Sequence, residues 1–213
     1  MMRAELDHLV VVAPTLAIGA EFVTQELGVE PQAGGAHSLM GTHNLLLRLG
    51  ANTYLEVIAI DPVAPRPKRP RWFALDDLPS GASPRLATWV ARTSDLDEAA
   101  DVVAPYVGNI ENMTRGSLRW RITIPPDGSL AHGGLIPSLI EWQTAEHPAV
   151  NMRESGCSLL MLEAYHSRPE LVREQLGRLG LDGAVKVTAL RTATSPHLVA
   201  HIDTPTGRRL IAV

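Results

Sequence analysis

The 213-residue chain contains a single cysteine, Cys157, so it cannot form an internal disulfide framework. One thiol suits a reducing compartment. The chain also lacks a long hydrophobic run near its start, because the apolar stretch at residues 9–13 is too short for a signal peptide or a membrane span. We therefore expect a soluble, cytoplasmic protein that does not associate with membranes.

An excess of basic over acidic residues is also missing, as are the common nucleotide and zinc motifs. The formal net charge of -4 and the pI near 6.0 provide no electrostatic basis for binding nucleic acid. No P-loop, dinucleotide glycine fingerprint or H-E-x-x-H string occurs, which excludes phosphoryl transfer and the usual zinc hydrolases. The hydrophobic content of 45% is that of an ordinary globular protein.

What is present is a pattern that recurs three times along the chain. Each occurrence begins with a strand rich in aliphatic residues, continues with a capped helix and ends with returning strands. The three strand and cap pairs are residues 6–13 with Thr15, residues 86–91 with Asp95, and residues 159–164 with Ser167. Such self-similarity predicts βαββ-type units that must pack together to bury one face of each sheet.

A hairpin in the first unit carries the first candidate residue. Its strands are predicted at residues 45–49 and 54–60, with a Gly-Gly turn at Gly34 and Gly35 ahead of them. Glu56 is the lone carboxylate in an otherwise apolar strand. Because a charged side chain is rarely buried without a partner, Glu56 raises the question of which group elsewhere in the chain pairs with it.

A proline-rich segment separates the first two units. Residues 61–71 contain four prolines and four basic residues, which is typical of an extended, solvated linker, although the basic cluster could instead hold an acidic ligand. Trp72 and Phe73 are expected to pin this linker to the body. We therefore divide the chain into module 1 (1–61), linker (62–85), module 2 (86–150) and a third unit (151–213).

Three stretches carry a resemblance to a known family. They are LDHLVVVAP at residues 6–14, GGAHSLMGTHNLLLRLGANTYLEVIAIDP at 34–62 and GGLIPSLIEW at 133–142. With them the chain resembles glyoxalase-like proteins of the vicinal oxygen chelate superfamily, which includes glyoxalase I, bleomycin-resistance proteins and extradiol dioxygenases. The resemblance implies an α+β fold, in which tandem βαβββ modules form a curled, cup-shaped mixed sheet, with a third βαββ-like unit at the C-terminus.

The resemblance also implies a metal site on the inner face of the cup. Its ligands would be His8, Glu56 and Glu141, whereas Thr88 occupies the fourth expected position and is a poor ligand. A histidine with two carboxylates suits a divalent ion such as zinc, nickel, manganese or iron. Glu141 and His43 are the predicted catalytic groups, because a carboxylate or a histidine beside the ion could shuttle a proton.

Each of these residues also has a structural alternative. His8 could be a hydrogen-bonded core histidine, and Glu56 and Glu141 could each pair with an arginine such as Arg48, Arg119 or Arg121. His43 could satisfy backbone groups where its strand begins. For His37 and Tyr54 we expect a structural role, for Trp120 and Trp142 a place in the core or the cup lining, and for Arg115 a turn.

Two functions from different classes follow. The first is a metal-dependent isomerase, lyase or dioxygenase that acts on a small oxygenated substrate. The second is a metal-free protein that binds and sequesters a small molecule in the same cup, which the threonine at position 88 favours. In a third alternative the C-terminal unit fills or caps the cup and the protein is structural. Exposed sheet edges would also permit a homodimer.

Overall fold

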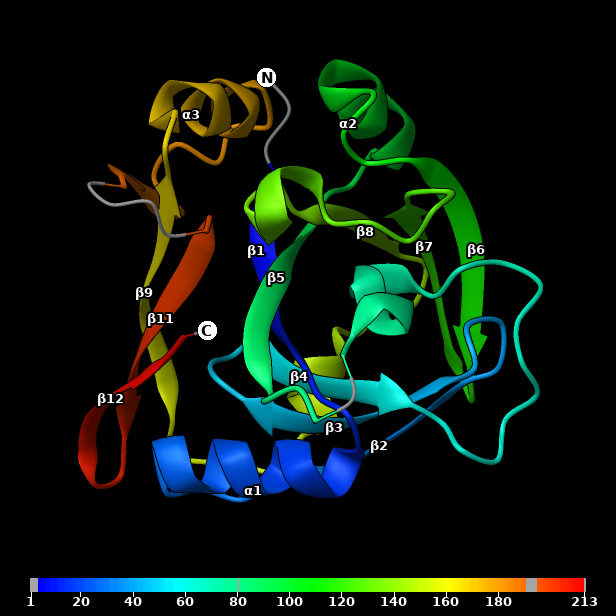
Figure 1. Ribbon diagram of the computed structural model, residues 1–213, viewed down its shortest axis with the longest axis vertical. Helices are drawn as coiled ribbons and strands as arrows, with labels where there is room; N and C mark the ends of the chain where they lie inside the picture. The colour runs from blue at the N-terminus through cyan, green and yellow to red at the C-terminus, as the bar shows by residue number, and fades with distance from the viewer. Residues whose placement is uncertain (1–3, 80, 191–194, 213) are drawn as a thin grey trace.

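The computed structural model describes residues 4–79, 81–190 and 195–212, and within them the chain forms two β-sheets with helices on their outer side (Figure 1). The strands of the larger sheet are β1 (Glu5–Val12), β2 (Gln32–His37), β3 (Thr42–Arg48), β4 (Tyr54–Ile60), β5 (Arg85–Arg92), β6 (Asn109–Arg115), β7 (Leu118–Ile124) and β8 (Ser138–Trp142). The smaller sheet contains β9 (Ser158–His166), β10 (Val185–Ala189), β11 (His197–Thr204) and β12 (Gly207–Ile211). The helices are α1 (Leu16–Leu27), α2 (Leu96–Val103) and α3 (Pro169–Arg178), with the 3-10 helices η1 (Trp72–Asp77), η2 (Ala131–Gly134) and η3 (Pro148–Asn151).

Two βαβββ modules are joined side by side in the larger sheet. The strand order is β2-β3-β4-β1-β5-β8-β7-β6, so the first and last strands of both modules occupy the centre. β1 pairs in parallel with β4 and antiparallel with β5, and β5 pairs in parallel with β8. The sheet curls until its edge strands β2 and β6 approach each other, and η1 lies inside the curl (Figure 1). This arrangement confirms the predicted α+β fold with a curled, cup-shaped mixed sheet.

The third unit forms the smaller sheet, whose strand order is β10-β9-β11-β12. It packs against the convex side of the larger sheet, beside β1 and β5 in Figure 1. The predicted last strand at residues 210–213 corresponds to β12, although Val213 lies outside the described residues. The division of the chain at residues 61, 85 and 150 stays a prediction.

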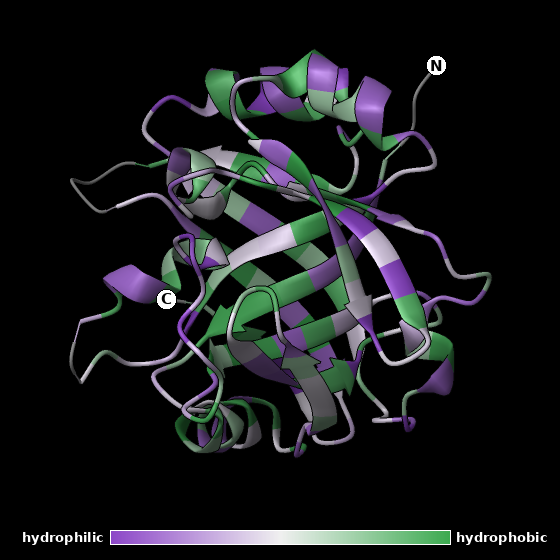
Figure 2. Cartoon of the chain, turned by 90° about the vertical axis from the view of Figure 1, so that its right-hand side faces the viewer, coloured by the Kyte–Doolittle hydropathy of each residue, from purple (hydrophilic) through white to green (hydrophobic). Residues whose placement is uncertain are grey.

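Both faces of the central strand β1 are buried, each in a different core. Leu9 and Val11 belong to the core between the two sheets, whereas Val10 and Val12 belong to the core inside the cup. A strand covered on both faces reads as a continuous apolar run, which explains the uninterrupted LVVV sequence. Figure 2 shows hydrophobic residues along the inner strands and hydrophilic residues on the outer faces of the helices.

Local signals at the helix ends agree with the sequence in two cases of three. The Thr15 side chain accepts a hydrogen bond from the Ile18 amide, and the Asp95 side chain accepts one from the Glu98 amide. The capping box expected at Ser167 is wrong, because Arg168 is the N-cap of α3 and forms no side-chain capping bond. Proline in the first turn of α3 supplies the start of that helix instead.

The aromatic residues after the proline-rich segment do pin it to the body. Trp72 and Phe73 are each 4% exposed and insert into the core inside the cup. The backbone at Phe73 and Ala74 is left-handed, with φ of 58° and 53°, which L-residues rarely adopt. Tertiary packing of the two rings therefore holds a locally unfavourable turn.

Two local predictions are wrong in the region that closes the cup. Gly34 and Gly35 lie within strand β2 rather than in a turn, next to a register shift in its pairing with β3. Strand β6 was not predicted, and Arg115 is its last residue rather than part of a turn. β6 is an edge strand of largely hydrophilic sequence, NIENMTR, with only Met113 buried, so it lacks the alternation that marks a strand.

The helices of the described residues are all too short or too polar to span a lipid bilayer.

Candidate functional site

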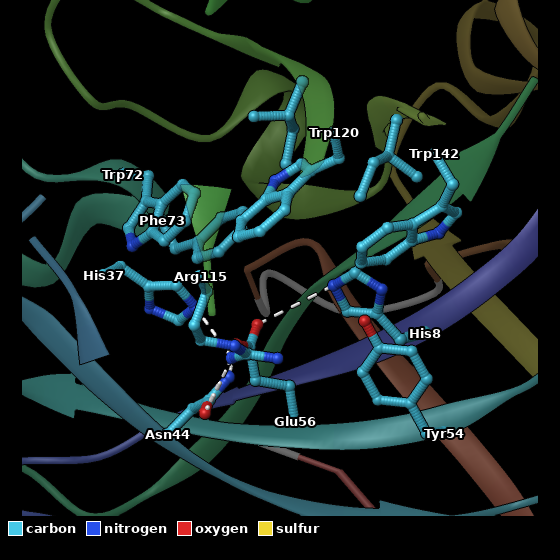
Figure 3. A pocket seen from close by; sticks show the side chains of 12 residues that line it. His8, His37, Asn44, Tyr54, Glu56, Trp72, Phe73, Arg115, Trp120 and Trp142 are labelled. Atoms are coloured by element: carbon cyan, nitrogen blue, oxygen red, sulfur yellow. Dashed lines mark hydrogen bonds and ion pairs between the residues drawn. The ribbon is translucent and has the colours of Figure 1, made fainter. Parts of the chain in front are cut away.

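A narrow polar pocket opens on the concave face of the larger sheet (Figure 3). Its cavity volume is about 20 Å³, which is enough for about one or two water molecules. Module 1 supplies most of its polar side chains, and η1 and module 2 supply most of its aromatic wall. The lining residues are His8, His37, Asn44, Tyr54, Glu56, Trp72, Phe73, Arg115, Trp120, Ile122, Ile140 and Trp142.

His8 is oriented by the residue before it. The Nδ1 atom of His8 lies 2.6 Å from Oδ1 of Asp7, which is fully buried. The pairing of β1 with β5 shifts register between Leu6 and His8, so Asp7 is the extra residue of a β-bulge. Such a bulge re-aims side chains, and here it lets neighbouring residues meet. The Nε2 atom of His8 is thereby directed toward Glu56 in the pocket, at 3.7 Å from Oε2 (Figure 3).

Asp7 is the centre of a buried network. Its Oδ2 atom accepts hydrogen bonds from Nε1 of Trp142 and Nε2 of His147, both at 2.9 Å. The Nδ1 atom of His147 accepts from the Ala149 amide at 3.2 Å, which sets its tautomer. Burial alone would raise the pKa of the Asp7 carboxyl, but hydrogen bonds from His147 and His8 hold that pKa well below its usual range. Asp7 is therefore a fixed negative charge behind His8.

Glu56 is held by an amide rather than by an arginine. It is 6% exposed, and its Oε1 atom accepts a hydrogen bond from Nδ2 of Asn44 at 2.5 Å. The Oδ1 atom of Asn44 accepts from the Gly35 amide at 2.8 Å and from Nη1 of Arg115 at 3.1 Å. These contacts fix which way the amide points, so Asn44 links Glu56 to Arg115 without bringing the carboxylate and the guanidinium into an ion pair.

His37 supports the same guanidinium from the other side. Its Nε2 atom lies 3.1 Å from Nη1 of Arg115, and its Nδ1 atom lies 3.2 Å from Oγ1 of Thr42. Because a guanidinium can only donate, Nε2 accepts and Nδ1 carries the proton. Burial lowers the pKa of His37 to about 4, so the ring is neutral at neutral pH. The ring of Trp120 lies below the guanidinium, 6.0 Å from its carbon.

Tyr54 lies beneath His8 as part of the pocket floor. The two rings stack with centroids 4.5 Å apart and planes 15° apart. Burial raises the pKa of the Tyr54 phenol well above its usual value, and the charges of Asp7 and Glu56 act in the same direction. Tyr54 therefore keeps its proton and restrains the imidazole, a closer part in the site than the packing role expected from the sequence.

Of the three predicted metal ligands, the structure brings together only His8 and Glu56. Glu141 lies on the opposite face of β8, where its Oε2 atom accepts from the Leu96 amide at 3.0 Å and lies 3.5 Å from Nη1 of Arg121. Its neighbours Ile140 and Trp142 face the pocket instead, because side chains alternate along a strand. A carboxylate at the first turn of α2 is a stabilising helix contact.

The other predicted site positions also lie outside the pocket. His43 is half-buried and does not line it, whereas Asn44, the next residue of β3, does. Thr88 donates a hydrogen bond to the Gly134 carbonyl at 3.0 Å. Sequence reasoning assigned His37 to structure and Arg115 to a turn, yet both line the pocket. The pair Gly34-Gly35 was the available signal, because glycines in a strand mark a close approach of other groups.

The donor set does not suit a divalent ion. His8 Nε2 and Glu56 Oε2 could hold a cation between them, but a protein site usually supplies at least three ligands. The nearest amide oxygen, on Asn44, is turned toward Arg115, whose positive charge opposes a second cation in the pocket. Over the described part of the chain, no group of three or more His, Cys, Asp or Glu side chains could hold a metal ion.

Comparison with known proteins agrees with the resemblance drawn from the sequence. The sequence model of a family described as glyoxalase-like domain matches residues 6–180. The crystal structure of a hypothetical protein from Staphylococcus aureus is similar, with a TM-score of 0.62 and 11% identity over 90% of this chain and 88% of that one. No curated protein sequence matches this chain.

Methylmalonyl-CoA epimerases are among the more distant structural matches. The enzyme from Mycobacterium tuberculosis has a TM-score of 0.42 and 18% identity, over 67% of this chain and 89% of that one. The Streptomyces coelicolor enzyme, in complex with 2-nitronate-propionyl-CoA, has a TM-score of 0.45 and 18% identity, over 70% of this chain and all of that one.

Proposed function

This chain belongs to the glyoxalase-like domain family of the vicinal oxygen chelate superfamily, and we propose that it is an isomerase-type enzyme that moves a proton on a small oxygenated substrate. The observation that carries the proposal is the pair formed by His8 Nε2 and Glu56 Oε2, 3.7 Å apart in one pocket. Fold alone would not define a reaction, since one fold hosts many chemistries.

His8 has the arrangement of a general base. A buried carboxylate on one ring nitrogen holds the imidazole in a single tautomer and stabilises the imidazolium that forms when the other nitrogen accepts a proton. Asp7 is that carboxylate, and its own hydrogen bonds keep it ionised. The free Nε2 atom can therefore accept a proton from a carbon next to a substrate carbonyl.

Glu56 provides the second proton-transfer group. Its Oε1 atom is occupied by Asn44, so Oε2 is the oxygen directed toward His8. In the proposed reaction His8 removes a proton from one carbon of the substrate, and His8 or Glu56 returns a proton to a neighbouring atom on the same side, which two groups 3.7 Å apart can both reach. The proton balance is closed, so neither a redox cofactor nor a co-substrate is required.

A second candidate function is binding without catalysis. It is favoured by the small size of the pocket and by the internal hydrogen bonds of Asp7, Glu56 and His37, which leave few polar atoms free for a substrate. The metal-dependent lyase and dioxygenase chemistries have less support, because Glu141 and Thr88 lie outside the pocket. In either case the single cysteine suits the cytoplasm, and the ligand is a small molecule.

Solvent deuterium exchange tests the proposal without knowledge of the natural substrate. Small carbonyl compounds, namely 2-oxo acids, their amides and hydroxyketones, are incubated in D₂O with the protein, and proton NMR follows exchange at the carbon next to the carbonyl. We expect at least one compound to exchange with wild type and not with His8→Gln, while Arg119→Gln, a change on the exposed face of β7, exchanges normally. If compounds bind the pocket but never exchange, the enzymatic proposal is wrong and the protein is a binding protein.

A further inference from the structure

Arg115 has charge that the protein does not neutralise. Six other arginines in the described residues lie within 4.0 Å of a carboxylate, for example Arg48 with Glu154 and Arg121 with Asp97. Several exposed arginines also lack such a partner, but among the described arginines without one only Arg115 lines this pocket. A cation that faces a pocket rather than a carboxylate is a feature of anion-binding sites.

The partners of Arg115 position it without cancelling its charge. His37, which is neutral, and the Asn44 amide both accept from the same atom, Nη1. Among the described residues, no hydrogen bond from the Nη2 or Nε atom of Arg115 to the protein is present. The two remaining sides of the guanidinium fork are therefore available to a ligand, in the geometry that matches two oxygens of one carboxylate.

The backbone opposite Arg115 is built to leave room for it. A Cβ atom on Gly35 would lie 2.8 Å from Cδ of Arg115, and one on Gly34 would lie 2.0 Å from Oδ1 of Asn44. Any larger residue in this part of β2 would displace the arginine or its amide partner. The two glycines thus allow a side chain from the edge strand β6 to reach across the mouth of the cup.

We propose that the molecule bound in this pocket is a small organic carboxylate, and that Arg115 supplies the positive charge that the sequence led us to expect from a divalent ion. This inference rests on the proposed function and defines its substrate class. The Arg115 guanidinium binds the carboxylate group, while His8 and Glu56 face the carbon that loses a proton. The rings of Trp72 and Trp120 form the walls against which the planar group lies.

Charge favours a monoanion over a phosphate dianion. Asp7 already places a negative charge behind His8, the Glu56 carboxyl lies on the other side of that ring, and Arg115 is the only arginine or lysine among the described residues that line the pocket. A carboxylate group is also flat and compact, which suits a pocket with space for about one or two water molecules. Entry of anything larger requires the side chains of the wall to move.

Binding, measured apart from catalysis, tests the inference. Tryptophan fluorescence and calorimetry follow titration with formate, acetate, 2-oxobutanoate and benzoate, and with the matched amide of each acid. We expect wild type to bind at least one carboxylate about tenfold or more tightly than its amide. Arg115→Gln should bring the carboxylate down to the affinity of the amide, Arg115→Lys should retain part of the preference, and Arg119→Gln should retain all of it.

A Gly35→Ala variant provides a second, independent perturbation, because it crowds Arg115 without changing any charge. Circular dichroism melts establish that each variant is folded before its affinity is compared. The inference is overturned if no carboxylate binds wild type at tens of millimolar, if amides bind equally well, or if Arg115→Gln keeps the preference. If carboxylates bind through Arg115 but never exchange deuterium, the inference stands and the enzymatic proposal fails. If neutral compounds exchange deuterium and carboxylates do not bind, the enzymatic proposal stands and the inference of a carboxylate ligand fails.

Discussion

The two modules of the large sheet contribute very different surfaces to the same cup. Module 1 contributes polar groups that hold or accept protons, including His8, His37 and Glu56. Module 2 contributes Trp120 and Trp142, aliphatic side chains, and a single charged residue from its edge strand. A repeated fold therefore does not repeat its chemistry. One module positions protons and the other provides the wall and the cation.

The last strands of the modules show where this asymmetry arises. In β4 the residues beside Glu56, Leu55 and Val57, pack in the core between the sheets, so the carboxylate faces the pocket. In β8 the residue before Glu141, Ile140, packs inside the cup, so that carboxylate faces α2. A shift of one residue reverses the face of every side chain on a strand.

The largest expected effect comes from neutralising these two carboxylates in turn. We expect Glu56→Gln to lower the rate of deuterium exchange by about 10²–10⁴-fold, since it removes a proton-transfer group. Glu141→Gln should leave the rate within about twofold and lower the free energy of unfolding by about 1 kcal/mol, as it weakens a contact with the first turn of α2. Exchange kinetics and urea unfolding measure both. Equal loss of rate in the two variants would contradict the asymmetry of the modules.

Asp7 is the residue on which module 1 depends most for stability. Asp7→Asn leaves three hydrogen-bond donors around a neutral group, and we expect a loss of about 3 kcal/mol at pH 7. Because the folded-state pKa of Asp7 lies below its unfolded value of 3.8, its contribution is full above that pH and is lost as the pH falls further. Urea unfolding at pH 7 and pH 3 should show a smaller acid-induced loss in Asp7→Asn than in wild type. The exposed Asp101→Asn variant serves as the control and should behave as wild type.

We expect a smaller effect of His37 on the free energy of unfolding at mildly acidic pH. Its pKa is about 4 when folded and 6.5 when unfolded, so the unfolded chain binds the proton first and stability falls as the pH drops below 6.5. Over the 1.5 units from pH 6.5 to 5 this costs about 2 kcal/mol. His37→Gln should lose less stability between pH 7 and 5 than wild type, whereas His43→Gln, on the other face of the sheet, should lose as much. Identical losses in all three proteins would show that His37 is not held neutral.

The smallest effect is expected from metal ions. With two suitable donors and a guanidinium in the pocket, the purified protein should contain well below one zinc, nickel, manganese or iron ion per chain. Adding these ions should leave the melting temperature unchanged, in wild type and in His8→Gln alike. Elemental analysis measures the content. Near-stoichiometric metal, lost in both His8→Gln and Glu56→Gln, would restore the metal-dependent hypothesis.

Much of the fold could be predicted because its signals are local. The helix caps at Thr15 and Asp95, the apolar run of β1 and the hairpin of β3 and β4 all follow from neighbouring residues. Strand β6 could not be predicted, because an edge strand buries little and needs no regular alternation. The candidate site was predicted in part: His8 and Glu56 meet, but Glu141 and His43 face the other way.

By itself, the sequence determined that the chain repeats a strand, helix and strand unit, belongs to the glyoxalase-like family, and carries a histidine and a carboxylate on central strands. Only the tertiary structure decided which side chains share the pocket. The bulge at Asp7, the register of β8 and the approach of β6 to β2 depend on contacts between residues far apart in the chain. Because side chains on a strand alternate between two faces, a one-residue difference in these contacts determines whether a carboxylate meets a substrate or a helix end.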